Sequence, residues 1–128
     1  MLSQRRVHAT IPTADVAAAR RFYEGVLGFT PLQVLPTLAL YEAGAGSVFA
    51  VSRGTGKASG SHTQMAFTTP DIEAEVAGLR ARGVSFEAYD YPTLRTVDGI
   101  AQLAGFRAAW FKDPEGNLIG LVEFADGG

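Results

Sequence analysis

Two segments of the chain carry apolar residues at the three- and four-residue spacing of an amphipathic helix. The first run begins after Asp15, a good N-cap residue, and ends at Gly28. The second begins after Asp71 and ends at Gly83, so the punctuation of the two runs matches. The pattern therefore predicts two helices, each with an aspartate cap and a glycine stop.

Each predicted helix follows a short alternating strand and precedes three β-like segments. The alternating strands are residues 6–11 and 63–69. The segments that follow the helices are 29–35, 38–43 and 47–53 in the first half, and 84–91, 106–111 and 117–124 in the second. Because the order strand, helix, three strands occurs twice, the sequence predicts an internal duplication. We expect one α+β domain over 1–128, made of βαβββ modules 5–53 and 62–124 joined by a Gly- and Ser-rich linker, 54–61.

The alternation divides each first strand into two faces. In the first module Val7 and Ile11 share the face that we expect the helix to cover. The opposite faces of the two sheets then carry small or polar residues at matching places: His8, Ala50, Gln64 and Gly120. Such a surface suits the wall of a small-molecule cleft, although it could equally be a solvated face.

Residues 92–105 form the longest stretch without helix or strand periodicity outside the linker. It mixes apolar side chains with Arg95 and Asp98, so it has groups to bury and groups to hydrogen-bond. Loops of this length in a compact domain are usually functional or mobile. We expect a lid over the cleft, with a solvated excursion or a dimer contact as the alternatives.

Composition narrows the function classes. A net charge of −2 without a basic stripe gives no indication of nucleic-acid binding, and no apolar run has membrane-spanning length. The chain has no cysteine, which excludes disulfides, thiolate ligands and a cysteine nucleophile. No signal-peptide pattern is present at the start, so a cytoplasmic location is the expectation.

Taken in order along the chain, these features resemble the vicinal oxygen chelate superfamily, which includes glyoxalase I, extradiol dioxygenases and bleomycin-resistance proteins. The matching pieces are Asp15, Phe22-Tyr23, Leu27-Gly28-Phe29, Asp71 and the segment KDPEGN at 112–117. The resemblance implies a partly open, curved β-sheet barrel around a cleft, built from two βαβββ modules. It also implies a homodimer.

In the metal-using members, the resemblance implies one ligand on the first and one on the last strand of each module. The corresponding positions here are His8, Ala50, Gln64 and Gly120. A catalytic zinc site needs at least three protein donors, whereas Ala50 and Gly120 supply none and Gln64 is a weak one. We therefore expect no metal cofactor. The blank positions indicate a cleft with room for a ligand, and a rescue of the metal site by Glu42, His62 or Glu123 is the alternative.

The aromatic residues have two interpretations each. Tyr41, Phe106, Tyr89, Tyr91 and Trp110 could stack on a ligand, or they could belong to the core. Trp110 is the strongest candidate for the cleft, because Ala108 and Ala109 leave room beside it. Phe22 and Tyr23 are predicted to be core.

The first functional hypothesis is a small-molecule-binding, bleomycin-resistance-like protein whose ligand contacts His8, Ala50, Gln64, Trp110 and Gly120. The second is an enzyme, with a lyase or isomerase of glyoxalase (lactoylglutathione lyase) type favoured over an extradiol dioxygenase. In that case His8 would serve as a metal ligand or general base. The third is a module that has lost catalysis and associates with a partner protein. The identity of the ligand does not follow from the sequence.

Overall fold

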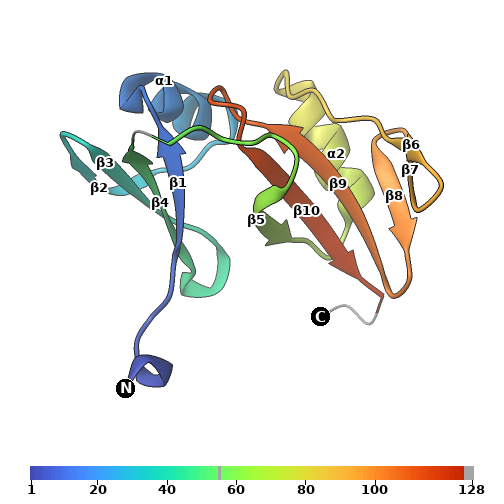
Figure 1. Ribbon diagram of the computed structural model, residues 1–128, viewed down its shortest axis with the longest axis horizontal. Coiled ribbons are helices and arrows are strands. Elements are labelled where there is room, and N and C mark those ends of the chain that lie inside the picture. Colours follow the sequence, from blue (N-terminus) through green and yellow to red (C-terminus); the bar gives the residue numbers. More distant parts are fainter. Residues whose placement is uncertain (55, 126–128) are drawn as a thin grey trace. The chain divides into compact units, whose positions relative to one another are not determined.

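The computed structural model describes residues 1–54 and 56–125, which form two compact units, Met1–Lys57 and Ala58–Gly128. Each unit is a βαβββ module with one curved, open sheet, so the predicted α+β class is confirmed (Figure 1). The boundary between the units falls in the stretch 54–61. Residue 55 of that predicted linker and residues 126–128 of the predicted domain lie outside the described residues.

The first unit contains a four-stranded sheet in the order β1-β4-β3-β2, in which β1 runs parallel to β4. Helix α1 continues directly as a π-helical segment, and this helix packs against β3 and β4. The elements are β1 (Ala9–Thr13), α1 (Val16–Arg20), the π-helix Arg21–Val26, β2 (Pro31–Leu35), β3 (Leu38–Glu42) and β4 (Val48–Arg53), with 3₁₀ turns at Leu2–Gln4 and Gly44–Gly46.

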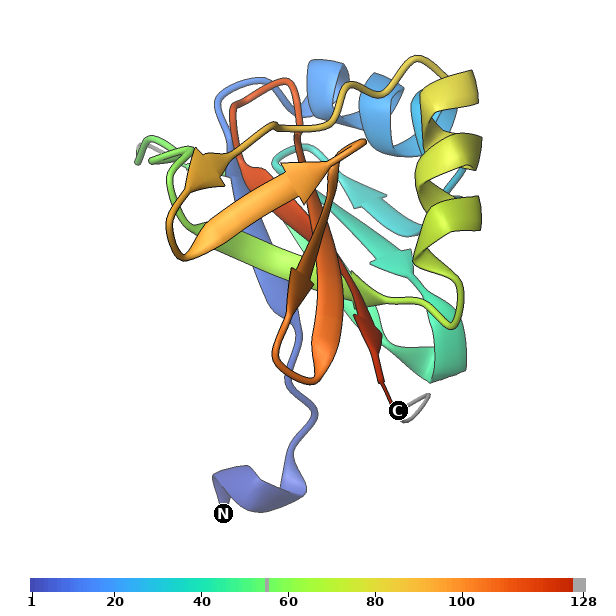
Figure 2. The ribbon, with the colours of Figure 1, turned by 90° about the vertical axis from the view of Figure 1, so that its right-hand side faces the viewer.

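The second unit repeats this plan with two additional strands. Its sheet has the order β5-β10-β9-β8-β7-β6, with β5 parallel to β10, and α2 packs against β9 and β10 (Figures 1 and 2). No helix in the described part of the chain is long and apolar enough to cross a membrane. The elements are β5 (Thr63–Thr68), α2 (Ile72–Ala81), β6 (Asp90–Tyr91), β7 (Leu94–Val97), β8 (Ile100–Leu103), β9 (Phe106–Lys112) and β10 (Leu118–Phe124).

Both helices begin where the sequence predicts. The carboxylate of Asp15 accepts a hydrogen bond from the backbone N–H of Ala18 at 3.0 Å, and that of Asp71 accepts one from Ala74 at 3.1 Å. Each aspartate thus satisfies one of the backbone donors that a helix N-terminus leaves unpaired. The shared cap fixes the same strand-to-helix turn in both units.

The core of the first unit is aromatic. Tyr41 has no exposed surface, and its ring stacks on Phe49 with the ring centroids 5.2 Å apart. Its hydroxyl donates a hydrogen bond of 2.9 Å to the carboxylate of Glu24 on the π-helical segment. Burial, followed by this hydrogen bond and the charge of Glu24, raises the pKa of Tyr41. Tyr41 is therefore a core residue, and Tyr23, also fully buried, confirms the predicted core role of that position.

The first strand begins later than the sequence predicts. β1 starts at Ala9, which pairs with Phe49, while the partner strand β4 itself starts at Val48. The residues before Ala9 therefore have almost no neighbouring strand to pair with, and Val7 is 93% exposed. The expectation that Val7 packs beneath the helix is wrong, and His8 precedes the strand instead of lying within it.

The stretch 92–105 is not an irregular loop. It contains β7 and β8, which are joined by a two-residue turn at Asp98 and Gly99 with φ angles of 53° and 82°. Two successive positive φ angles are typical of a type I′ hairpin turn, which favours Asp-Gly. In the second sheet β8 lies next to β9, just as β2 lies next to β3 in the first sheet. The predicted strand 84–91 is largely wrong, because only Asp90–Tyr91 forms a strand there and Phe86 contributes an isolated bridge.

Glu123 on β10 fastens the start of α2 to the sheet. Its carboxylate accepts a hydrogen bond from the backbone N–H of Ile72 at 3.0 Å and from the guanidinium of Arg107 at 2.7 and 2.9 Å. Arg107 also donates to Glu73 at 3.0 Å. The bond from Ile72, together with the positive Arg107, lowers the pKa of Glu123 below its ordinary value.

This lowered pKa predicts an acid-sensitive contribution to stability. A carboxyl whose folded-state pKa lies below its unfolded value stabilises the fold above the ordinary value of 4.5, and this contribution is lost as the pH falls through the folded-state pKa. We expect the melting temperature of Glu123→Gln to fall less steeply than that of the wild type between about pH 5 and pH 3. Thermal melts across this range measure the difference, with Glu42→Gln, an exposed change on β3, as the control. Parallel wild-type and Glu123→Gln curves would contradict the prediction.

Candidate functional site

A cavity of about 450 Å³ lies on the second unit, lined by residues of the strands β5, β6, β7, β9 and β10. Its volume is within the range of small-molecule sites, roughly 300–1,000 Å³. The segment before β5 and the irregular stretch after α2 provide the remaining walls. The lining includes His62, Thr63, Glu87, Tyr89, Tyr91, Leu94, Trp110 and Lys112.

Three aromatic rings line this cavity in a continuous row. The ring of Tyr89 meets Trp110 edge to face, with the centroids 5.6 Å apart and the planes at 76°. Tyr89 also stacks on Tyr91, with the centroids 6.1 Å apart and the planes at 29°. Tyr91 is 57% exposed, so its face remains accessible to a ligand. The row offers both ring faces and ring edges, which suits a flat apolar molecule.

Trp110 spans the sheet from β9 toward β5. Its indole N–H donates a hydrogen bond of 3.1 Å to the hydroxyl of Thr63, although β10 lies between these two strands. The position that the indole crosses is Gly120, the cross-strand partner of Trp110. A Cβ atom at Gly120 would lie 3.2 Å from the Thr63 methyl group, 3.3 Å from the Ala66 Cβ and 3.6 Å from the indole.

The missing side chain at Gly120 therefore has a structural consequence different from the predicted one. The sequence indicates open room for a ligand at this position. In the structure the space above Gly120 is already occupied by Thr63, Ala66 and the indole of Trp110. The glycine allows the indole to lie close to the strand. The cavity itself lies farther along the sheet, beside Tyr89 and Tyr91.

One ion pair borders the aromatic row. The Lys112 ammonium lies 3.5 Å from the Glu87 carboxylate, and both side chains are partly exposed. The backbone N–H of Glu87 donates to the Trp110 carbonyl at 2.8 Å, which ties this segment to β9. Burial, followed by the negative charge of Glu87, raises the pKa of Tyr89, so its hydroxyl is a neutral phenol at physiological pH.

The candidate site residues predicted from the sequence lie in both units. In the first unit His8 is exposed before β1, and Ala50, fully buried on β4, pairs with Thr10. In the second, Gln64 is half-buried on β5, and Gly120 pairs with Ala66 and Trp110. Trp110 and Gly120 are thus brought together. Of the five residues predicted to contact a ligand, Trp110 lines the cavity, as do Tyr89 and Tyr91, two other aromatic candidates, and His62.

The donor set at the four positions implied for a metal does not fit one. Ala50 and Gly120 carry no donor atom, and no donor could be placed at Gly120 without moving Thr63 and Ala66. Of the alternative donors, Glu123 is held by Arg107 and the start of α2. His62 has its Nδ1 atom 2.5 Å from the hydroxyl of Ser59.

Sequence reasoning missed the polar part of this cavity. Glu87 and Lys112 were not singled out, nor was Thr63, the partner of the indole. A signal for Lys112 is present in the sequence, since it lies two residues after Trp110 and hence on the same face of β9. Thr63 and Glu87 approach Trp110 only through the strand order, which no local pattern shows.

The segment KDPEGN forms a tight turn between β9 and β10. The carboxylate of Asp113 accepts hydrogen bonds of 2.9 Å from the backbone N–H groups of Glu115 and Asn117. The buried side-chain amide of Asn117 donates a further bond of 2.8 Å to Asp113. These residues fix the hairpin that brings Trp110 opposite Gly120, so their role in the structure is conformational.

Comparisons with known proteins agree with this architecture. The family model for the glyoxalase/bleomycin resistance protein/dioxygenase superfamily matches residues 5–121. A glyoxalase/bleomycin resistance protein/dioxygenase from Nocardioides is 24% identical, with 98% of this chain and 87% of that chain covered and a TM-score of 0.68. A comparison with curated protein sequences found no match.

Two further solved structures have a similar fold. TnmS3, an antibiotic binding protein from Streptomyces sp. CB03234, is 25% identical, with 95% and 99% of the two chains covered and a TM-score of 0.66. A glyoxalase family protein from Enterococcus faecalis is 23% identical, with 96% and 100% covered and a TM-score of 0.70. The duplicated βαβββ modules define the glyoxalase-like class of folds. The chain belongs to the glyoxalase/bleomycin resistance protein/dioxygenase superfamily.

Proposed function

We propose that this protein binds a flat, largely apolar small molecule in the cavity beside Trp110, and that it does so without a metal ion. The observation that carries the proposal is the row of three rings, Tyr89, Tyr91 and Trp110, along a cavity of about 450 Å³. Stacked and edge-to-face contacts with such rings contribute roughly 0.5–1.5 kcal/mol each beyond the burial of apolar area.

The polar groups at the margin would orient the ligand. The Lys112 ammonium and the Glu87 carboxylate lie at one side of the rings and provide a donor and an acceptor. A few polar groups around an apolar wall are the usual composition of a small-molecule site. TnmS3, which has a similar fold, is an antibiotic binding protein, and this supports a small-molecule ligand for the present chain.

The metal-dependent alternatives, a lyase or isomerase of glyoxalase type or an extradiol dioxygenase, need donors at positions where this chain has Ala50 and Gly120. Of the four positions, His8 alone carries a strong donor, and one histidine does not make the three-donor set of a catalytic metal. Elemental analysis of protein purified without a histidine tag tests this part of the proposal. A stoichiometric metal that is lost in His8→Ala would refute it.

The ligand hypothesis can be measured directly, because Trp110 is the only tryptophan in the chain. We expect acridine to change the Trp110 emission saturably, whereas adamantanol, which is apolar but not flat, should give little change. Tyr91→Ala should weaken acridine binding by up to about tenfold through the loss of one stacking partner. Leu32→Ala, an exposed apolar residue in the first unit, is the matched control and should leave the affinity unchanged.

Two outcomes would count against the proposal. Equal affinity in Tyr91→Ala and the wild type would mean that the aromatic row is not the binding surface. A linear, unsaturable change in emission with every flat probe would mean that the three rings serve only in packing and do not bind a ligand.

A further inference from the structure

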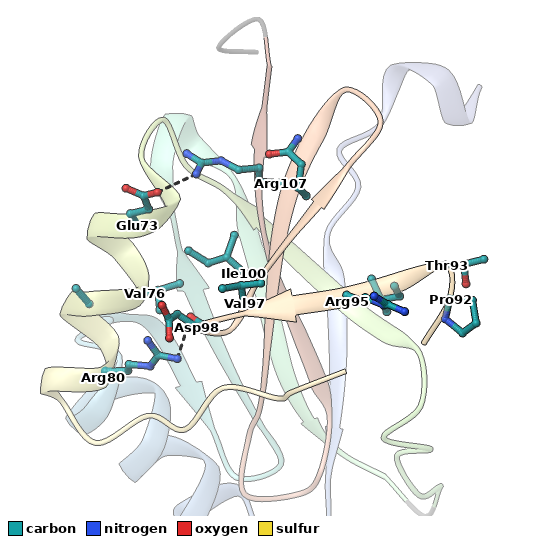
Figure 3. A pocket seen from close by; sticks show the side chains of 13 residues that line it. Glu73, Val76, Arg80, Pro92, Thr93, Arg95, Val97, Asp98, Ile100 and Arg107 are labelled. Carbon is teal, nitrogen blue, oxygen red and sulfur yellow. Dashed lines mark hydrogen bonds and ion pairs between the residues drawn. The ribbon is translucent and has the colours of Figure 1, made fainter. Parts of the chain in front are cut away.

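A second and larger hollow, the α2–hairpin groove, lies in the same unit between helix α2 and the hairpin β7–β8 (Figure 3). Its volume is about 740 Å³. Figure 3 shows three arginines around its margin, Arg80, Arg95 and Arg107, with apolar side chains between them. These arginines are not part of the row of rings formed by Tyr89, Tyr91 and Trp110.

The floor of the groove is apolar and partly accessible. Val76 on α2 and Ile100 on β8 face one another across it, and Val97 on β7 is 75% exposed. An exposed β-branched side chain in a hollow loses its contact with water when a ligand covers it, which favours binding by the hydrophobic effect.

The three arginines differ in what they bind. The guanidinium of Arg107 already has partners, because it donates hydrogen bonds to the carboxylates of Glu123 and Glu73. Arg95 is 72% exposed and makes one contact of 3.4 Å with Asp90, itself 89% exposed. A pair so open to solvent is weak and easily replaced.

Arg80 is held in place by a backbone carbonyl and an aromatic ring. Its guanidinium donates one hydrogen bond of 3.0 Å to the backbone carbonyl of Asp98 and lies over the ring of Phe86, 5.5 Å from the centroid. It also approaches the turn closely, since a Cβ atom at Gly99 would lie only 2.9 Å from it. Among the described residues no carboxylate forms an ion pair with Arg80.

We propose that the α2–hairpin groove binds a small carboxylate with an apolar chain. The carboxylate pairs with the guanidinium of Arg80, and the chain covers Val97 and Ile100. A guanidinium that is already oriented loses little side-chain entropy on binding, and its planar fork matches a carboxylate. Arg95, at the far end of the floor, adds positive potential and selects against cations.

Calorimetric titration with decanoate, decanol and decylamine tests the head-group requirement. We expect decanoate to bind saturably at one site, decanol to bind at least about tenfold more weakly, and decylamine not to bind. Arg80→Gln should weaken the binding of decanoate by about tenfold or more and leave the affinity for decanol unchanged. Arg53→Gln removes the same charge from the end of β4 in the first unit and should have no effect.

The outcomes separate this proposal from that for the aromatic cavity, even though Leu94 borders both hollows. Loss of decanoate binding in Arg80→Gln with normal acridine binding supports the groove. Equal binding of decanoate by Arg80→Gln and the wild type, or equal binding of decylamine and decanoate, overturns it. A dimer that Val97→Asp dissociates, together with no heat from decanoate, would identify the groove as a contact between two copies of the chain and would also overturn it.

Discussion

Replacing Phe111 with alanine should lower the free energy of unfolding by about 3–5 kcal/mol. Phe111 is only 1% exposed on β9, where it pairs with Ile119 on β10. Its ring meets Phe86 edge to face at 5.7 Å and 73°. The substitution removes a large apolar group from between the sheet and the segment after α2, and the backbone of two paired strands cannot close the resulting cavity.

A matched change at Phe124 isolates the contribution of burial. Phe124 lies on the neighbouring strand β10 and is 42% exposed, so Phe124→Ala removes the same atoms from a site that water already reaches. We expect a loss of about 1 kcal/mol or less. Urea denaturation of both variants and the wild type gives the comparison. Similar losses for the two variants would mean that Phe111 does not lie in a close-packed core.

The parts of the fold that could be predicted from the sequence are those fixed by local chemistry. An aspartate cap acts on a backbone N–H three residues away, so Asp15 and Asp71 indicate the helix starts without any knowledge of the sheet. The turn from Asp113 to Asn117 is likewise closed by its own side chains. Because these signals recur at equivalent places, the duplication could also be recognised.

Strand pairing was the part that local chemistry did not determine. Residues 84–91 have a strand-like composition, yet β8 occupies the place next to β9. The deciding signal was the Asp98-Gly99 turn, which creates a hairpin within a stretch of weak alternation. The segment 84–91 is held instead by isolated hydrogen bonds, among them those between Tyr89 and Thr96.

The candidate site was only partly accessible to sequence reasoning for the same reason. The nomination of Trp110 rests on its own chemistry and on the small residues beside it, and both are visible in the sequence. Its contacts with Thr63 and Tyr89 join strands and segments far apart in the chain, and they exist only once the sheet has formed. The arginines at the margin of the α2–hairpin groove are also brought together by topology and not by spacing.

Gly120→Ala and Gly78→Ala should change the stability in opposite directions. A Cβ atom at Gly120 would lie 3.2 Å from the Thr63 methyl group and 3.3 Å from the Ala66 Cβ. Overpacking of this kind costs about 1–3 kcal/mol. At Gly78, in the middle of α2, no atom beyond the neighbouring residues and the helix backbone lies within 4 Å of the new Cβ. The higher helix propensity of alanine should therefore stabilise the protein by about 0.5–1 kcal/mol.

The same substitution at Gly120 should also alter the binding cavity. Thr63 and Ala66 both lie on β5, but the Ala66 Cβ is fixed to the paired backbone, whereas the Thr63 side chain can rotate, and its rotation breaks the hydrogen bond from the Trp110 indole. We therefore expect a red-shifted Trp110 emission and weaker acridine binding in Gly120→Ala, with neither change in Gly78→Ala. A destabilised Gly120→Ala variant with unaltered emission would show that the strand and not the indole absorbs the added methyl group. In that case the glycine would serve the packing of β5 on β10 alone.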